Sequence, residues 1–230
     1  MKPLPECQLY AFVDTAYLRG RAPRIVAQQL CDGGADLIQL RAKLSPTEEV
    51  RRLAEEILPV TKRAGIALVI NDHLSVAQEV GAEFCHLGQG NFFGAGHTRV
   101  SQLATAPHPD VLQGAHSRAL ASRLGIGLSS AAPEQAARAI AAGADYLGVG
   151  PVYPTGTKPT AKPVTLDYVR WAAANIAIPW FAIGGINLMN LDDVLTAGAQ
   201  RICVVSAILN DDDLATACRR FKDRLPPMAR

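Results

Sequence analysis

Short apolar runs alternate with longer amphipathic stretches along the whole chain. The apolar runs show little in–out alternation, which is typical of parallel strands covered on both faces. They predict eight strands, at Gln8–Asp14, Asp36–Arg41, Ala67–Asn71, Glu83–Leu87, Leu124–Ser129, Tyr146–Gly150, Trp180–Ile183 and Arg201–Ser206. The stretches between them have helical spacing and predict helices at Arg24–Cys31, Pro46–Arg63, Val76–Val80, Pro133–Ala142, Leu166–Asn175, Leu191–Ala197 and Asp212–Arg224.

A weak internal repeat marks the junctions between helices and strands. Gly-Ala followed by a polar residue begins at Gly34, Gly81, Gly143 and Gly198, each time where a predicted helix ends. Glycine suits the left-handed conformation that terminates many helices. One such Gly-Ala junction for every two strand–helix units predicts an α/β protein, a (βα)8 TIM barrel forming a single domain over residues 1–230. An open doubly wound sheet also alternates strands and helices, but eight even units favour the closed barrel.

One segment interrupts this rhythm after the fourth predicted strand. Residues from Gly90 to Arg118 are rich in Gly, Ala, His and Pro. We therefore expect an inserted irregular segment at about residues 90–118, with a short helix around Arg99–Ala104. A lid over a site and a simple surface excursion are both open interpretations, because long irregular segments serve either purpose.

Composition narrows the class of protein. Hydrophobic residues make up 49% and charged residues 19% of the 230 positions, which excludes disorder and permits a large core. Aromatic residues are only 6%, so we expect a core of Ala, Val, Leu and Ile. The formal charge of +2 gives no attraction to nucleic acid, and no apolar run is long enough for a membrane span. Five scattered cysteines, without metal-ligand spacing, favour free thiols, and together these features predict a soluble cytoplasmic protein.

Polar side chains gather where the second and third predicted strands end, the edge at which barrel enzymes place their sites. Gln39, Arg41 and Lys43 alternate, so their side chains are expected to share one direction and to suit an anionic ligand. A polar network between strands is the alternative. Asp72, beside Asn71, is a natural Mg²⁺ ligand when phosphates are present, but it could equally cap the following helix.

The later strand ends add further groups suited to anions. Ser129 and Ser130 could donate to a phosphate or cap the next helix. Thr155, Thr157 and Lys158 stand in a loop rich in Gly and Pro. Strands seven and eight end in a double glycine, Gly184-Gly185, and in a helical turn at Val205-Ser206; such parts often form a phosphate cradle in barrels. His86 lies inside a strand and is expected to be a core residue with satisfied hydrogen bonds.

Eight motifs occur in order from about Leu9 to Ile208: Q-L-R-x-K, I-N-D, H-L-G-Q, G-x-S, G-A-D-Y-x-G-x-G-P-V, T-x-T-K, I-G-G-I and V-V-S-A-I. In this order, at the ends of the predicted strands, they resemble the thiamine phosphate synthase family. The resemblance implies a Mg²⁺-dependent transferase. It would couple hydroxymethylpyrimidine diphosphate to a thiazole phosphate, giving thiamine phosphate and pyrophosphate. Small phosphorylated substrates are therefore the expected partners; a homo-oligomer is possible, and the sequence does not determine the oligomeric state.

The resemblance also implies roles for individual residues. The pyrimidine diphosphate would be bound by Gln39, Arg41, Lys43, Asn71, Ser129 and Lys158. The thiazole phosphate would be bound by Thr155, Thr157, Gly185, Val205 and Ser206. Arg41, Ser129 and Lys158 would act in catalysis, because charge develops on the departing pyrophosphate. Asp72 and the residue at position 91 would ligate Mg²⁺.

This chain departs from the family pattern at three positions. Where the family usually reads H-L-G-Q-E-D, the chain has Gly90 and Asn91, so the expected metal site keeps an oxygen ligand but loses one negative charge. Ala131 stands where a His or Thr is common, which counts against the related thiazole tautomerase branch. Two alternatives to an active synthase follow: a non-catalytic paralogue that binds a phosphate ligand, and a thiazole-phosphate tautomerase-type barrel.

Overall fold

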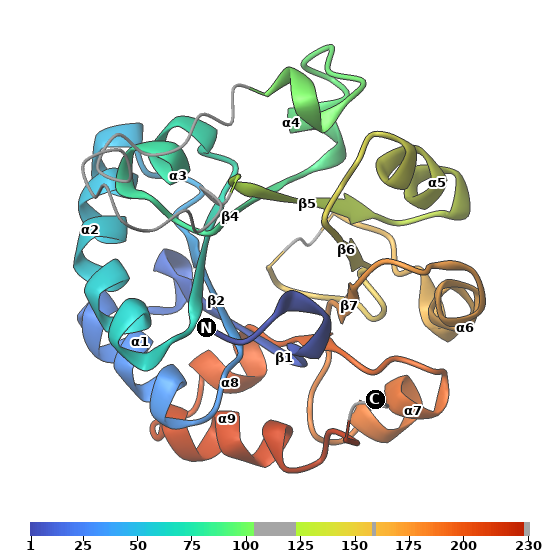
Figure 1. Cartoon of the computed structure of the whole chain (residues 1–230). Coiled ribbons are helices and arrows are strands. Elements are labelled where there is room, and N and C mark those ends of the chain that lie inside the picture. The colour runs from blue at the N-terminus through green and yellow to red at the C-terminus, as the bar shows by residue number, and fades with distance from the viewer. Residues whose placement is uncertain (104–122, 158–159, 228–230) are drawn as a thin grey trace.

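The computed structural model describes residues 1–103, 123–157 and 160–227. Eight parallel strands pair in chain order and close into a barrel, with helices around its outside, which confirms the predicted (βα)8 fold (Figure 1). The strands are β1 Leu9–Asp14, β2 Leu37–Arg41, β3 Ala67–Asn71, β4 Phe84–Leu87, β5 Gly125–Ser130, β6 Tyr146–Val149, β7 Trp180–Ile183 and β8 Ile202–Cys203. The α-helices are α1 Pro23–Asp32, α2 Thr47–Ala64, α3 Leu74–Val80, α4 Gln89–Phe92, α5 Pro133–Ala141, α6 Thr165–Asn175, α7 Leu191–Thr196, α8 Ser206–Leu209 and α9 Leu214–Lys222.

The eighth strand is much shorter than the expected Arg201–Ser206. Leu9 and Tyr10 of β1 pair with Ile202 and Cys203, and this pairing closes the barrel. Val205 has φ −115° and ψ −89°, which lies outside the extended region, and α8 begins at the next residue. The chain therefore turns into a helix at Ser206 instead of continuing as a strand.

The predicted irregular segment begins later than expected. Gly90 and Asn91 belong to α4, so the first part of the segment is helical. The short helix expected around Arg99–Ala104 is present as a 3-10 turn at Val100–Gln102. Residues 104–118 of the segment lie outside the described residues.

Few aromatic residues are present, yet several of them occupy the barrel interior, which corrects the expectation of a purely aliphatic core. The ring of Tyr10 lies 5.3 Å from that of Phe181 and 6.0 Å from that of Tyr146, measured between centroids. Gly127 makes room for Tyr146, because a Cβ at residue 127 would come within 2.1 Å of the tyrosine ring. A polar aromatic layer thus fills the barrel directly below the ends of the strands.

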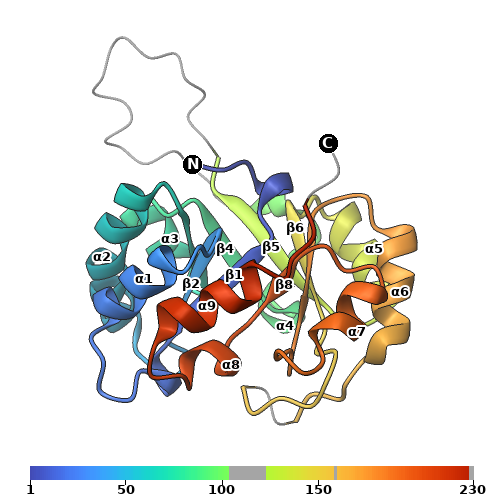
Figure 2. The ribbon, with the colours of Figure 1, turned by 90° about the horizontal axis from the view of Figure 1, so that it is seen from below.

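The opposite end of the barrel is held by a largely buried carboxylate. Figure 2 shows the N-terminal turn Leu4–Glu6 at the end away from the loop that follows β6. Asp36 accepts hydrogen bonds there from the backbone N–H groups of Gln8 (2.8 Å) and Leu9 (3.0 Å). It also pairs with Lys2 and Lys222. Burial alone would raise the pKa of Asp36, but the contacts with Lys222, Leu9, Gln8 and Lys2 outweigh burial, so that the pKa is lowered.

Asp36→Asn is expected to lower the free energy of unfolding by about 2 kcal/mol at pH 7, because the amide loses charge-assisted hydrogen bonds. A lowered folded-state pKa gives stability that is present above the ordinary pKa of Asp and is lost as the pH falls through the folded value. The difference in the free energy of unfolding between the variant and the natural protein should therefore shrink as the pH falls below about 4. Urea unfolding from pH 3 to 8 measures it, with the exposed Asp167→Asn as control. A difference that does not vary with pH would contradict the argument.

Within the described residues, no helix combines the length and the apolar character that a bilayer crossing requires.

Candidate active site

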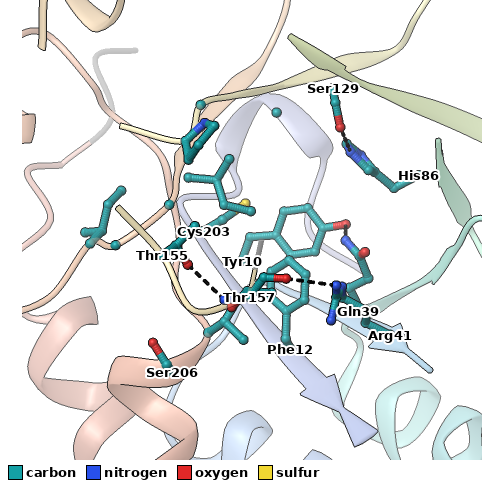
Figure 3. Close-up of a pocket in the computed structure, with 18 of the residues that line it drawn as sticks. Tyr10, Phe12, Gln39, Arg41, His86, Ser129, Thr155, Thr157, Cys203 and Ser206 are labelled. Carbon is teal, nitrogen blue, oxygen red and sulfur yellow. Dashed lines mark hydrogen bonds between the residues drawn. The ribbon is translucent and has the colours of Figure 1, made fainter. Parts of the chain in front are cut away.

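A pocket of about 140 Å³ opens at the carboxyl ends of the barrel strands. Nine of the eleven residues expected to bind substrate line it, namely Gln39, Arg41, Asn71, Ser129, Thr155, Thr157, Gly185, Val205 and Ser206. Figure 3 shows Ser206 on one side of this pocket and Ser129 with His86 on the other. Their convergence follows from the barrel, in which the ends of all strands meet at one mouth.

Two expected residues are not part of this lining. Strand β2 ends at Arg41, so the alternation that aligns Gln39 with Arg41 does not extend to Lys43. Lys43 stands in the turn after the strand, where its side chain is exposed. Lys158 lies outside the described residues. The roles of both lysines stay predictions.

Arg41 is held in one orientation by a buried carboxylate. Its Nη1 donates to Oδ2 of Asp14 at 2.7 Å, and its Nη2 donates to the backbone oxygen of Thr157 at 3.3 Å (Figure 3 shows the second bond). The exposed fraction is 13% for the Arg41 side chain and 1% for that of Asp14. Sequence reasoning missed Asp14, although an acid at the end of an apolar strand was a signal. The pair aims a fixed guanidinium at the pocket.

A chain of hydrogen bonds crosses the floor of the pocket from β2 to β5. The Nε2 of Gln39 donates to the hydroxyl of Tyr10 at 2.6 Å, and the Tyr10 and Tyr146 hydroxyls lie 3.0 Å apart. His86 continues the chain, with Nδ1 3.2 Å from the Tyr146 hydroxyl and Nε2 3.0 Å from Oγ of Ser129. Desolvation by burial raises the pKa of both phenols well above the ordinary value, so both remain neutral.

These hydrogen bonds decide between the alternatives left open for Gln39 and His86. The interstrand polar network considered for Gln39 exists, but the same residue also lines the pocket. His86 has the satisfied hydrogen bonds expected of a core histidine, and it lines the pocket as well. Tyr10 and Tyr146 had not been singled out in the sequence. The chain gives Ser129 a fixed partner beside the ligand space.

The two glycines after β7 allow the neighbouring loop to pack closely. Val152 donates to the Ile183 oxygen at 2.9 Å, and Tyr153 donates to the Gly184 oxygen at 3.0 Å. Gly185 has φ +65°, and a Cβ there would lie 2.5 Å from the backbone oxygen of Pro154. Packing alone therefore requires glycine at this position. The same packing brings Thr155 and Thr157 to the pocket.

Asp72 is presented at the end of β3 by an unusual backbone. Its φ is +63°, a left-handed conformation that Asp tolerates better than most residues. The Nδ2 of Asn71 donates to Oδ2 of Asp72 at 2.7 Å, and the backbone N–H of Gly88 lies 3.4 Å from Oδ1. The cap of α3 is His73, without a side-chain bond, so the helix-cap interpretation of Asp72 is wrong.

Asn91, the other expected metal ligand, belongs to α4 and has an exposed side chain. Gly88, which contacts the Asp72 carboxylate, is the cap of this same helix. Asp72 and Asn91 thus come from neighbouring strand ends. Within the described part of the chain, no three His, Cys, Asp or Glu side chains form a cluster that could hold a metal ion.

The helix-capping alternative fails for the two serines of β5. The cap of α5 is Ala132, without a side-chain bond. Ser130 is buried and bonds to the Ala132 oxygen and the Tyr168 hydroxyl, whereas Ser129 faces the pocket. Ser129 is therefore the serine that a ligand can reach.

A closed (βα)8 barrel with a polar pocket at the carboxyl ends of its strands has the architecture of the barrel enzymes. A family model described as thiamine monophosphate synthase matches residues 9–208, and the chain belongs to this family. Its relatives include a thiamine-phosphate synthase from Methanospirillum hungatei, 40% identical, with the match covering 95% of this chain and 97% of that protein. The one from Chloroflexus aurantiacus is 37% identical over 94% of this chain and 91% of the relative.

Solved structures share the fold of this chain. Thiamine phosphate pyrophosphorylase from Pyrococcus furiosus superposes with a TM-score of 0.76 at 27% identity, over 96% of each chain. (S)-3-O-geranylgeranylglyceryl phosphate synthase from Thermoplasma acidophilum has a TM-score of 0.65 at 14% identity, over 95% of this chain and 93% of that one. The second likeness concerns the fold alone.

Proposed function

We propose that this protein couples hydroxymethylpyrimidine diphosphate to a thiazole phosphate and releases thiamine phosphate and pyrophosphate. The observation that carries the proposal is that nine residues of the expected substrate-binding set line one pocket, in a chain of the thiamine monophosphate synthase family. A pocket for two phosphorylated molecules needs donors on opposing sides, and Arg41 and Ser206 both line this one.

In the proposed reaction, the bond between the pyrimidine methylene carbon and the diphosphate oxygen breaks. Both electrons of that bond leave with pyrophosphate, and the lone pair of the thiazole nitrogen then forms the new C–N bond. Arg41 and Lys158 supply positive charge to the departing pyrophosphate, and Ser129 supplies a hydroxyl. Donors that are already oriented stabilise developing charge without reorganisation. The pairing of Arg41 with Asp14 and of Ser129 with His86 supports such preorganisation.

The thiazole phosphate is assigned to the other side of the pocket. Thr155 and Thr157 offer hydroxyl groups from the loop after β6, and Ser206 offers one at the start of α8. Gly185 and Val205 line the same side. Backbone N–H groups of such loops are typical phosphate donors in barrels.

The residues present fit a Mg²⁺ ion. Asp72 offers a carboxylate oriented by Asn71, and Asn91 offers an amide oxygen; Mg²⁺ prefers oxygen ligands and is commonly bound through one or two protein groups together with substrate phosphates. When bound, the ion would neutralise charge on the diphosphate. Asp72 is the one charged member of this pair, so the metal affinity should depend chiefly on it.

We assign the reaction to the cytoplasm. The five cysteine thiols are free, which suits a reducing compartment, and four of them are buried. Burial raises the pKa of Cys7 to about 11 and that of Cys218 to about 12, which keeps these thiols protonated and unreactive near neutral pH.

A coupling assay with both phosphorylated precursors across a Mg²⁺ titration tests the function, with Asn91→Asp measured in parallel. We expect thiamine phosphate from the natural protein. The variant should reach half-maximal rate at a Mg²⁺ concentration about tenfold lower, because a second carboxylate strengthens the site. Gln102→Glu, which adds a negative charge at an exposed position of the 3-10 turn, is the matched control and should leave the requirement unchanged.

Three other outcomes would change the proposal. Product with an unchanged Mg²⁺ requirement in Asn91→Asp would remove residue 91 from the metal site. Product from the variant alone would identify the natural protein as a ligand-binding paralogue with a silenced site. No product from either protein, although both are folded, would overturn the synthase proposal.

A further inference from the structure

The carboxylate of Asp14 uses both of its oxygens at the end of β1. Oδ2 accepts from Arg41, as described above, and Oδ1 accepts from the backbone N–H of Ala16 at 3.0 Å. The second bond caps the 3-10 turn Thr15–Tyr17. Because Asp14 is 1% exposed, water does not compete for either bond. One buried side chain therefore fixes both Arg41 and the turn that carries Tyr17.

Both connections from Asp14 lead to the same residue, Thr157. Arg41 donates to the Thr157 backbone oxygen at 3.3 Å. The Tyr17 hydroxyl lies 3.4 Å from the Oγ1 of Thr157. Each contact is long and weak alone, but two contacts at one residue restrict both its position and its rotation.

These contacts hold the distal part of the loop after β6. The proximal part is bonded to β7 and Gly184 through the N–H groups of Val152 and Tyr153. Beyond Tyr153, the hydrogen bonds described between Thr155–Thr157 and the rest of the protein go to Tyr17 and Arg41. Within this segment, the Thr157 N–H donates to Oγ1 of Thr155 at 3.3 Å, so the position of Thr157 also affects Thr155.

We propose that Asp14 is a positioning residue that couples the two substrate subsites: by holding Arg41 and Tyr17 together against Thr157, it makes the binding of one phosphorylated substrate strengthen the binding of the other. The identity of the two ligands rests on the proposed function. An anion that orders Arg41 also orders the loop that carries Thr155 and Thr157, and a ligand on those threonines orders Arg41 in return. Such coupling between sites is reciprocal by thermodynamic necessity.

The test measures the dissociation constant of the thiazole phosphate by calorimetry, with and without inorganic pyrophosphate, at constant Mg²⁺. Pyrophosphate serves as the probe of the diphosphate subsite. In the natural protein we expect pyrophosphate to tighten thiazole phosphate binding by about fivefold or more. In Asp14→Asn the ratio should fall to about one, because the amide cannot keep both connections in place.

Asp145→Asn is the matched control. Asp145 also gives one oxygen to a backbone N–H, that of Ile126 (2.7 Å), and the other to an arginine, Arg123 (2.6 Å). It precedes β6 and therefore lies at the end of the barrel away from the pocket. This variant should keep the fivefold ratio even if its melting temperature falls. A reduced ratio in Asp145→Asn would show that general loosening accounts for the effect, and it would overturn the proposal.

A second variant covers the case in which Asp14→Asn does not fold. Tyr17→Phe leaves the buried pair intact and removes only the hydroxyl that contacts Thr157. It should weaken thiazole phosphate binding about threefold. The binding of pyrophosphate in the absence of thiazole phosphate should be unchanged. Normal turnover with the same coupling ratio in Tyr17→Phe as in the natural protein would overturn the coupling only. Failure of the natural protein to bind either ligand would overturn the proposed function together with it.

Discussion

Asp72→Ala is expected to lower the rate of thiamine phosphate formation by about two to three orders of magnitude, while the barrel remains folded. Asp72 offers the charged oxygen ligands at the proposed metal position, and Asn71 already orients them. Without this carboxylate, the proposed Mg²⁺ ion would be bound weakly. Steady-state kinetics at ordinary Mg²⁺ concentration and a thermal melt of the same preparation measure the two effects.

The backbone at Asp72 calls for a second variant. Alanine is less tolerant than aspartate of φ +63°, so Asp72→Ala also carries a conformational cost of about 1 kcal/mol. Asp72→Asn keeps the shape and tolerates the left-handed conformation, but it removes the charge. It should therefore melt like the natural protein and still lose most of its activity. Full turnover by either variant at ordinary Mg²⁺ would remove Asp72 from the metal site.

Arg41→Ala is expected to reduce both activity and stability. The rate should fall by about a hundredfold or more, because in the proposed reaction Arg41 is an oriented donor to the departing pyrophosphate. The free energy of unfolding should fall by about 3 kcal/mol, because the Asp14 carboxylate stays buried without its guanidinium partner. Urea unfolding and the coupling assay separate the two quantities.

A double variant separates the effect of the lost donor on activity from the effect of the unpaired buried carboxylate on stability. In Arg41→Ala combined with Asp14→Asn, no unpaired charge remains buried, so part of the lost stability should return while the activity stays low. Arg41→Ala with unchanged stability would contradict the buried ion pair. Recovery of activity in the double variant would contradict a direct role of Arg41 toward the diphosphate.

The barrel could be predicted because its pattern is repetitive. Apolar runs, helical spacing and glycine junctions each predict the same succession of strand and helix in successive units. The observed elements follow the expected order. Strand ends meet at one mouth in any such barrel, so the polar residues at those ends could be grouped before their contacts were known. Ser129 and Thr155, far apart along the chain, line the same pocket for this reason.

Other features of the site could not be predicted from the pattern of apolar and polar residues. A strand that is covered on both faces has apolar residues on both, so nothing in β1 or β6 reveals that Tyr10 and Tyr146 face the barrel interior. The role of Asp14 depends on its ion pair with Arg41 on the next strand, which only the folded structure shows. The alternation that grouped Lys43 with Gln39 assumed that extended backbone continues for two residues past Arg41, where both the predicted strand and β2 end. Strand length and inward direction depend on tertiary pairing, which local sequence does not encode.

The hydrogen-bond chain across the pocket floor has a direction. The Nε2 of Gln39 can only donate, so the Tyr10 oxygen accepts and its single proton is available for Tyr146. We predict that Tyr146 in turn donates to Nδ1 of His86, so that Nε2–H is the atom that donates to Ser129. The ¹⁵N chemical shifts of His86 would report this tautomer, and a protonated Nδ1 would refute it. With this tautomer, an amide on β2 would set the direction of the hydrogen bonds as far as a hydroxyl on β5: the Ser129 oxygen would accept from His86, and the Ser129 proton would be free to donate to a phosphate oxygen of the proposed substrate.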